Sequence, residues 1–306
     1  MILLDSGAYS LFKEYTQKQE GKNDFSFYET DTFWEYVDNY AEFVLEHKEE
    51  LELYVSVDII FNPELSWKVQ KYLENKGITP LPVFHAGEDF SWLKKYIDNY
   101  DYIGIGGLAQ ISSSKAKWYT SLGDPAFNMI CDDKGMPRVK VHGFAMTSPD
   151  LIINFPWFSC DSSSWMQYGK YALILVPKKQ GNKFIYDIPP HTLCVSSRKE
   201  AKIKAKHFDS LSKIEKTHVY EYLEMKGVPF GKSILKEVSF DRTKPELPIS
   251  VTEISSEEEI IEEGVCNNGE IRDDINLEYF LDLEDSIEPW PHVWKRKSKM
   301  ITRLPF

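Results

Sequence analysis

The sequence predicts an α/β protein built as a (β/α)8 TIM barrel. Eight short β-rich runs recur in about the first 200 residues, and each is followed by a stretch long enough to form a helix. Apolar residues between the first runs repeat at helical spacing. Because strands and helices alternate, the sheet is expected to be parallel. A doubly wound open sheet is the competing arrangement.

The strands are expected, in order, at Ile2–Leu4, Leu53–Val57, Leu81–Phe84, Tyr102–Ile105, Arg138–Val141, Trp157–Cys160, Ala172–Val176 and Thr192–Val195. The first helix is predicted by an apolar face made of Phe33, Trp34, Val37, Tyr40, Ala41 and Val44. The next is predicted by Trp67, Val69, Tyr72 and Leu73. Residues 197–227 are expected to form a helix that ends at Gly227 as its C-cap and closes the barrel.

Two domains are predicted, a barrel over 1–208 and a helical and acidic extension over 209–306. Acidic residues are concentrated near the C-terminal end, and 236–288 has the composition of a mobile or loosely docked appendage. The net charge of −12 argues against a general nucleic-acid binder, although most of the imbalance lies in that block.

The composition predicts a soluble, intracellular protein. Hydrophobic residues make up 42% and charged residues 27%, which is ordinary for a globular chain. There is no long uncharged apolar run, and Asp5 stands where a signal peptide needs an apolar core. The four cysteines are far apart, so we expect no structural zinc and no disulfide framework. No cofactor is expected.

Residues that could take part in catalysis or ligand binding follow the predicted strand ends. They are Asp5, Asp58, His85, Gly106, Gly107, His142 and Asp161. Parallel sheets carry their chemistry at this edge, so three carboxylates and two histidines are expected to share one rim. The alternatives are structural: each aspartate as a helix cap, and each histidine bonded to nearby backbone rather than to a metal.

Two carboxylates across one pocket can divide the work of glycosyl transfer, one attacking an anomeric carbon and the other moving the proton of the leaving base. Asp58 is a third carboxylate that could read donors on a substrate edge. The Gly-x-Gly-x-x-Ala run from Gly104 is a weak dinucleotide signal, because no apolar helix face follows it. Close approach of the backbone to a flat ligand explains it better, with the amides of Gly107 and Leu108 as donors.

Three ordered motifs carry a family resemblance: Asp5-Ser6-Gly7-Ala8-Tyr9, Gly106-Gly107-Leu108-Ala109, and Phe158 to Asp161. With these motifs in this order and spacing, the chain resembles the tRNA-guanine transglycosylase superfamily, most closely its short phage-encoded relatives, some of which act on DNA. The resemblance covers about residues 1–180. It implies a transglycosylase-like barrel, here without the family's zinc subdomain.

The resemblance also implies roles for individual residues. Asp161 would be the nucleophile that attacks C1′, and Asp5 the general acid and base. Tyr9 would stack on the base, Asp58 would accept from the N1–H and 2-amino edge of guanine, and Gly106, Gly107 and Leu108 would contact the base through backbone. His85 takes a position where the family usually has Gln, and His142 lies on the same rim. Ser10 replaces the family's Gln after the aromatic residue.

These implications predict a pentosyltransferase in the cytoplasm of a bacterial or phage-infected cell. It would replace guanine in a nucleic acid, DNA in preference to tRNA, with a 7-deazaguanine such as preQ0, and a homodimer is possible. A base in a duplex must be flipped or presented single-stranded first. Candidate phosphate contacts are Lys178, Lys179, Lys199 and Lys202, whose alternative is a solvated surface. Two other functions stay open: a catalytically silent nucleobase binder or DNA mimic, and an N-glycosylase that releases the base by hydrolysis.

Overall fold

The computed structural model describes residues 2–17, 23–107, 119–146, 148–197, 205–242 and 251–294. The chain folds into two compact units. Unit 1 comprises 1–146, 154–161 and 289–306, and unit 2 comprises 147–153 and 162–288. This division places residues 162–208 in the same unit as residues 209–288. The domain boundary expected between residues 208 and 209 stays a prediction.

The strands of unit 1 are parallel and follow one another in chain order. They are β1 (Leu3–Leu4), β2 (Leu53–Tyr54), β3 (Val83–His85), β4 (Tyr102–Gly106), β5 (Lys140–Gly143) and β6 (Ser159–Cys160). β1 pairs with β2, and β3 to β6 form a four-stranded sheet. A parallel bridge between Val55 and Leu81 continues the pairing from β2 toward β3. The first six predicted strands are therefore confirmed, and their carboxyl ends point the same way.

Helices connect these strands, as parallel pairing requires. They are α1 (Ala8–Leu11), α2 (Asp31–His47), α3 (Pro63–Asn75), α4 (Phe90–Asn99) and α7 (Asp124–Ile130), with shorter helical turns at Phe12–Thr16, Ser26–Glu29 and Tyr119–Gly123. Side chains of Thr30, Asn62 and Asp89 accept backbone N–H groups at the starts of α2, α3 and α4. The apolar face predicted for α2 is buried from Phe33 to Val44, so that helix is confirmed.

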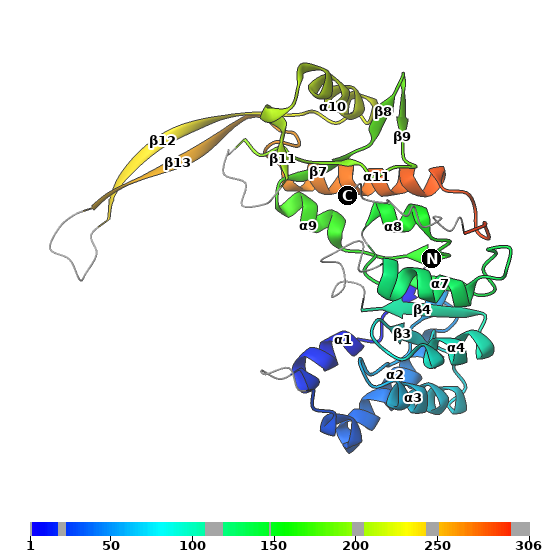
Figure 1. Cartoon of the computed structure of the whole chain (residues 1–306). Coiled ribbons are helices and arrows are strands. Elements are labelled where there is room, and N and C mark those ends of the chain that lie inside the picture. Colours follow the sequence, from blue (N-terminus) through cyan, green and yellow to red (C-terminus); the bar gives the residue numbers. More distant parts are fainter. Residues whose placement is uncertain are drawn as a thin grey trace, which may run out of the picture. The chain divides into compact units, whose positions relative to one another are not determined.

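Unit 2 contains the remaining elements. They are α8 (Pro149–Asn154, whose last residue belongs to unit 1), α9 (Ser164–Lys170), β7 (Leu173–Val176), β8 (Lys178–Gln180), β9 (Lys183–Ile185), β10 (His191–Cys194), β11 (Lys206–His207), a 3-10 turn at Phe208–Ser210, α10 (Lys213–Met225), β12 (Lys232–Arg242), β13 (Val251–Glu262) and α11 (Gly269–Ser286). Figure 1 labels most of them along the chain.

The predicted (β/α)8 barrel is wrong. The seventh and eighth predicted strands exist as β7 and β10, but they run antiparallel, with Leu173 opposite Cys194 and Val176 opposite His191. A hairpin of β8 and β9 joins them in place of a helix. An antiparallel pair can be joined by a hairpin whereas a parallel pair needs a longer crossover, so the barrel pattern stops after β6. In the described ranges the strands form separate small sheets, parallel and antiparallel, and no closed barrel.

The helix expected over 197–227 is shorter than predicted. Of its described part, 206–207 is strand β11, and α10 begins only after Ser212. Ser212 and Glu215 form a reciprocal capping box there. The C-terminal end is as expected, because Gly227 follows the helix with a left-handed φ of 69°.

The acidic segment is not a loose appendage at α11. Ile275, Tyr279 and Leu283 of this helix are fully buried in unit 2. The side chain of buried Asn276 accepts the Leu175 N–H at 2.8 Å and donates to the Leu173 carbonyl at 3.0 Å, which completes one edge of β7. Asp274, Glu278, Glu284 and Asp285 of α11 are exposed, whereas Asp273 and Asp282 are partly buried, so this acidic helix is part of the core of unit 2.

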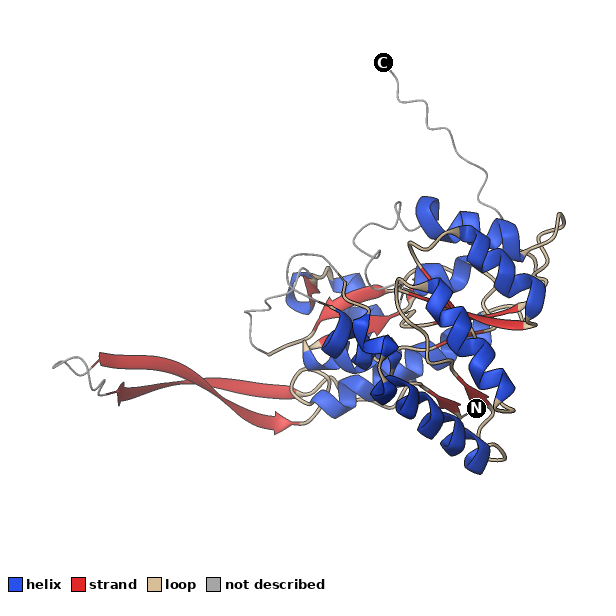
Figure 2. Ribbon diagram, turned by 90° about the horizontal axis from the view of Figure 1, so that it is seen from below, coloured by secondary structure: helices blue, strands red, loops and turns tan. Residues whose placement is uncertain are grey.

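β12 and β13 form a long antiparallel ribbon. Eleven residue pairs join them, from Lys232 opposite Glu262 to Arg242 opposite Val251. Figure 2 shows the ribbon twisted along its length and extending from the rest of unit 2. Part of the predicted C-terminal extension is therefore ordered β structure. The side chains of Ile234, Leu235 and Ile260 are exposed on this ribbon.

Candidate active site at the carboxyl edge of the unit 1 sheet

The predicted site residues of unit 1 lie at the ends of neighbouring parallel strands. His85 ends β3 and is in register with Gly106 at the end of β4. Gly143, next to His142, is in register with Cys160, and Asp161 follows directly. This edge is where parallel α/β sheets place their chemistry.

The three aspartates are not helix caps. The N-cap of α1 is Gly7, which makes no side-chain cap, and the N-cap of α3 is Asn62 rather than Asp58. The N-cap of α9 is Ser163 rather than Asp161. None of the three is therefore the N-cap residue of the helix that follows it.

Asp58 and His85 form a buried pair. Asp58 Oδ2 lies 2.9 Å from His85 Nε2, and both side chains are less than a tenth exposed. Burial raises the pKa of Asp58 to about 8 and lowers the pKa of His85 to about 4. The nearby Glu88 also has a pKa raised by burial, to about 7, and it accepts the His85 backbone N–H at 3.0 Å. At neutral pH these shifts favour a protonated Asp58 carboxyl that donates to a neutral imidazole.

Gly106 and Gly107 are needed by the protein's own packing. A Cβ at Gly106 would lie 3.2 Å from His85 Nε2, closer than side chains normally approach. Gly107 has a φ of 74°, in the left-handed region that favours glycine, and lies beside the Ala86 backbone. These glycines let the ends of β3 and β4 come together around His85. Leu108, predicted with them, lies outside the described residues.

Asp161 is an accessible carboxylate held from one side. Its side chain is 54% exposed, and its Oδ1 accepts the Ala145 N–H at 2.8 Å. His142 Nε2 lies 3.5 Å from the same oxygen. Partial burial alone would raise the pKa of Asp161, but the interactions with His142 and the Ala145 amide outweigh it and lower the pKa below its usual value. Asp161 is thus ionised at neutral pH.

The loop that donates to Asp161 has an unusual backbone. Ala145 has a φ of 52°, a left-handed conformation that costs an alanine about 1 kcal/mol or more. That conformation accompanies the hydrogen bond from the Ala145 N–H to the carboxylate. Non-glycine residues with left-handed backbone conformations concentrate at functional sites, which supports a functional role for the region around Asp161 and Ala145.

Asp5 and Tyr9 lie near the other end of this edge. Both are exposed, Tyr9 by 59%, and the Tyr9 ring carries Lys13 Nζ at 5.5 Å from its centroid. The negative charge of Asp5 contributes to the raised pKa of Asp58, after burial and Glu88. Asp5 is thus electrically linked to the Asp58 pair. In the ranges with described structure, no hydrogen bond or ion pair joins this group to Asp161.

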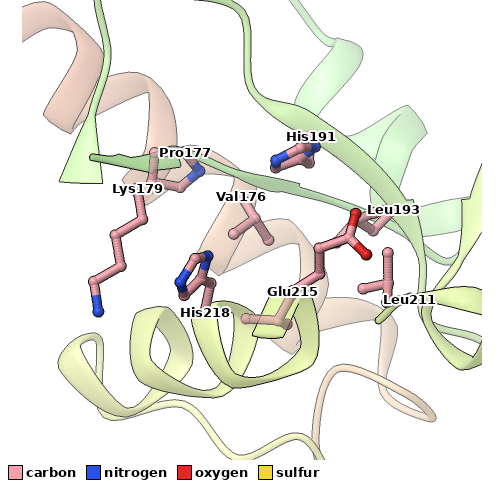
Figure 3. A pocket seen from close by; sticks show the side chains of 9 residues that line it. Val176, Pro177, Lys179, His191, Leu193, Leu211, Glu215 and His218 are labelled. Atoms are coloured by element: carbon pink, nitrogen blue, oxygen red, sulfur yellow. The ribbon is translucent and has the colours of Figure 1, made fainter. Parts of the chain in front are cut away.

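The predicted phosphate contacts are only partly visible. Lys178 and Lys179 lie on β8 in unit 2. Lys179 forms an ion pair with Glu221, so its charge is already balanced. Its side chain borders a small pocket that is also lined by His191, His218 and Glu215 (Figure 3). Lys199 and Lys202 lie outside the described residues.

Sequence reasoning missed the residues behind Asp161. Ser159 and Tyr102 are connected to His142 by hydrogen bonds, and Glu88 lies behind His85. Ser159 is inside a predicted strand and Tyr102 starts one. The only available signal was that both are polar residues on strands that end at the predicted rim.

Comparison with known proteins gives no family assignment: no family model, no curated protein and no solved structure matches this chain. Among the described side chains, no group of three or more His, Cys, Asp or Glu is arranged to hold a metal ion. The helices within the described ranges are all too short or too polar to cross a lipid bilayer.

Proposed function

We propose that this chain is a nucleobase-exchange transglycosylase that replaces guanine in a nucleic acid, DNA in preference to tRNA, with a 7-deazaguanine such as preQ0. One observation carries the proposal: Asp161 is an ionised, accessible carboxylate at a strand end, fixed by the Ala145 N–H and faced by a buried histidine. The resemblance of three ordered motifs to guanine transglycosylases supports the same chemistry.

The reaction would proceed by two displacements at one sugar carbon. An Asp161 oxygen bonds to C1′ while the bond from C1′ to guanine N9 breaks, and the leaving base takes a proton from Asp5, which must hold that proton when the base departs. Asp5, now a carboxylate, removes the N9 proton of the incoming base. That nitrogen then bonds to C1′ and releases Asp161, so the sugar keeps its configuration. Tyr9 is exposed as an apolar platform on which a base could stack.

The environments of Asp161 and Asp58 give these two carboxylates different protonation states. Asp161 has a lowered pKa and Asp58 a raised one, although both follow strands of the same parallel arrangement. Groups whose surroundings push their pKa values apart are typical of acid–base sites. The proposal does not depend on a closed barrel, because all of these residues belong to unit 1.

Incubation with labelled preQ0 tests the proposal, using separate pools of duplex DNA, single-stranded DNA and tRNA. We expect label to enter a DNA pool with the wild-type chain and not with Asp161→Asn. Asp98→Asn, which changes an exposed carboxylate of α4 that pairs with Lys94, is the matched control and should keep full exchange. Label in no pool would contradict the proposal, and abasic sites without label would indicate hydrolysis instead.

A further inference from the structure

Three hydrogen-bonding side chains line up behind Asp161. Tyr102 OH lies 2.6 Å from Ser159 Oγ, and Ser159 Oγ lies 2.6 Å from His142 Nδ1. The other ring nitrogen, Nε2, faces Asp161 Oδ1 at 3.5 Å and is completely buried, with no closer partner in the described part of the chain. The series spans β4, β5 and β6 and ends at the proposed nucleophile.

The imidazole of His142 is held tightly in this position. Its side chain is only 1% exposed. The Phe144 ring packs edge-on against it, with ring centroids 4.4 Å apart. A ring confined in this way cannot turn to exchange its two nitrogens without disturbing the packing. Which nitrogen carries the proton is therefore decided by the neighbours of each one.

Those neighbours favour a proton on Nε2. An ionised Asp161 can only accept, so an unprotonated Nε2 would place two acceptors against each other in a buried site. A proton on Nε2 leaves Nδ1 as the acceptor, and the Ser159 hydroxyl can donate to it. Ser159 Oγ can then accept from the Tyr102 hydroxyl. Burial raises the pKa of Tyr102, so its hydroxyl keeps the proton that it donates. Every group donates once, in the same direction, toward the carboxylate.

We propose that Tyr102, Ser159 and His142 are positioning residues that fix the Nε2–H tautomer of His142 and direct this N–H at Asp161. The separation of 3.5 Å would shorten to a hydrogen bond when charge and geometry at Asp161 adjust to a bound substrate, and this bond would keep the carboxylate oriented for attack. The catalytic consequence rests on the proposed function, while the tautomer and its cause do not.

Nitrogen NMR of the wild-type protein tests the tautomer directly. Protein labelled with ¹⁵N-histidine is measured at about pH 8, where an ordinary histidine is neutral, and the His142 signals are assigned by their loss in His142→Gln. We expect a protonated Nε2 and an unprotonated Nδ1. A protonated Nδ1 at this residue would overturn the proposal, whatever the protein's activity.

Two conservative variants test the cause. Ser159→Ala removes the donor to Nδ1 and should increase the fraction of the Nδ1–H form, and Tyr102→Phe should do so to a smaller extent. Ser91→Ala, an exposed serine on α4, is the control and should leave the spectrum unchanged. An unaltered tautomer ratio in Ser159→Ala would refute the role of the serine.

Guanine exchange supplies a separate readout. Loss of one donor in the series should lower kcat by about tenfold. Because the groups act in series, the Tyr102→Phe and Ser159→Ala double variant should be no slower than Ser159→Ala alone, whereas independent structural effects would multiply. Multiplying effects in variants that remain folded would overturn the relay. If wild-type protein shows the expected tautomer but exchanges no base, the proposed function fails and the relay stands.

Discussion

The buried Asp58–His85 pair predicts that the free energy of unfolding depends on pH in a specific window. Asp58 has a native pKa of about 8 against an ordinary value of 3.8, so the folded chain holds a proton that the unfolded chain has lost. The contribution of Asp58 to the free energy of unfolding is greatest below its ordinary pKa of 3.8, and it falls as the pH rises toward its native pKa of about 8. His85 has the opposite sign, because its pKa falls from 6.5 to about 4.

The size of the effect follows from where the two contributions overlap. Between about pH 4 and 6.5 the falling contribution of Asp58 and the rising contribution of His85 offset each other. Above pH 6.5, the ordinary pKa of His85, only Asp58 of this pair still changes the free energy of unfolding with pH. Its contribution keeps falling until the pH reaches its native pKa of about 8. That window spans about 1.5 pH units, and at about 1.4 kcal/mol per unit Asp58 alone should contribute a loss of about 2 kcal/mol.

Asp58→Asn isolates this contribution. The asparagine amide can still donate to His85 Nε2, so the variant keeps the hydrogen bond and loses only the titration. Urea unfolding of both proteins at a series of pH values should show their difference in stability changing by about 2 kcal/mol across the window. Asp98→Asn, at an exposed position, should run parallel to wild type. Parallel profiles for Asp58→Asn as well would refute the reasoning.

Two further predictions concern packing. Asn276→Leu should lower the free energy of unfolding by about 2–4 kcal/mol, because it strips two buried backbone groups of β7 of their partner; urea unfolding measures this, with the exposed Leu277→Ala as control, and a loss below about 1 kcal/mol would contradict it. Gly106→Ala should cost about 1–3 kcal/mol, since its Cβ would press on His85. The same assay would show the reverse if the new methyl group were accommodated, because replacing glycine by alanine in a compatible conformation is stabilising.

The sequence predicted the strands better than it predicted how they pair. All eight expected strands are present, because each is a short apolar run bounded by polar or glycine residues. The direction of the last two depends on the connection between them, and 177–190 contains the hairpin of β8 and β9 where a crossover was assumed. Lys178–Gln180 is polar throughout and Lys183–Ile185 is only three residues long, so neither stands out as a strand and periodicity alone could not reveal the reversal.

The site could be predicted where a residue's position along its own strand was sufficient. Asp161, His85 and His142 were found because they stand at strand ends, and parallel strands end at one edge. Tyr102 and Ser159 contact His142 across three strands, so their roles depend on register and on side-chain length. No pattern within a single strand carries that information, and it becomes visible only when the sheet is assembled.

The neutral state of Asp58 changes what its proposed role requires. Accepting both the N1–H and the 2-amino group of guanine takes two carboxylate oxygens free to accept, which means an ionised side chain. In the structure one oxygen is committed to His85, and burial keeps the carboxyl protonated near neutral pH. Guanine binding at this position would therefore have to displace a proton from the pair. It follows that base affinity should rise as pH increases toward 8, whereas a base read only by backbone amides would bind equally well throughout.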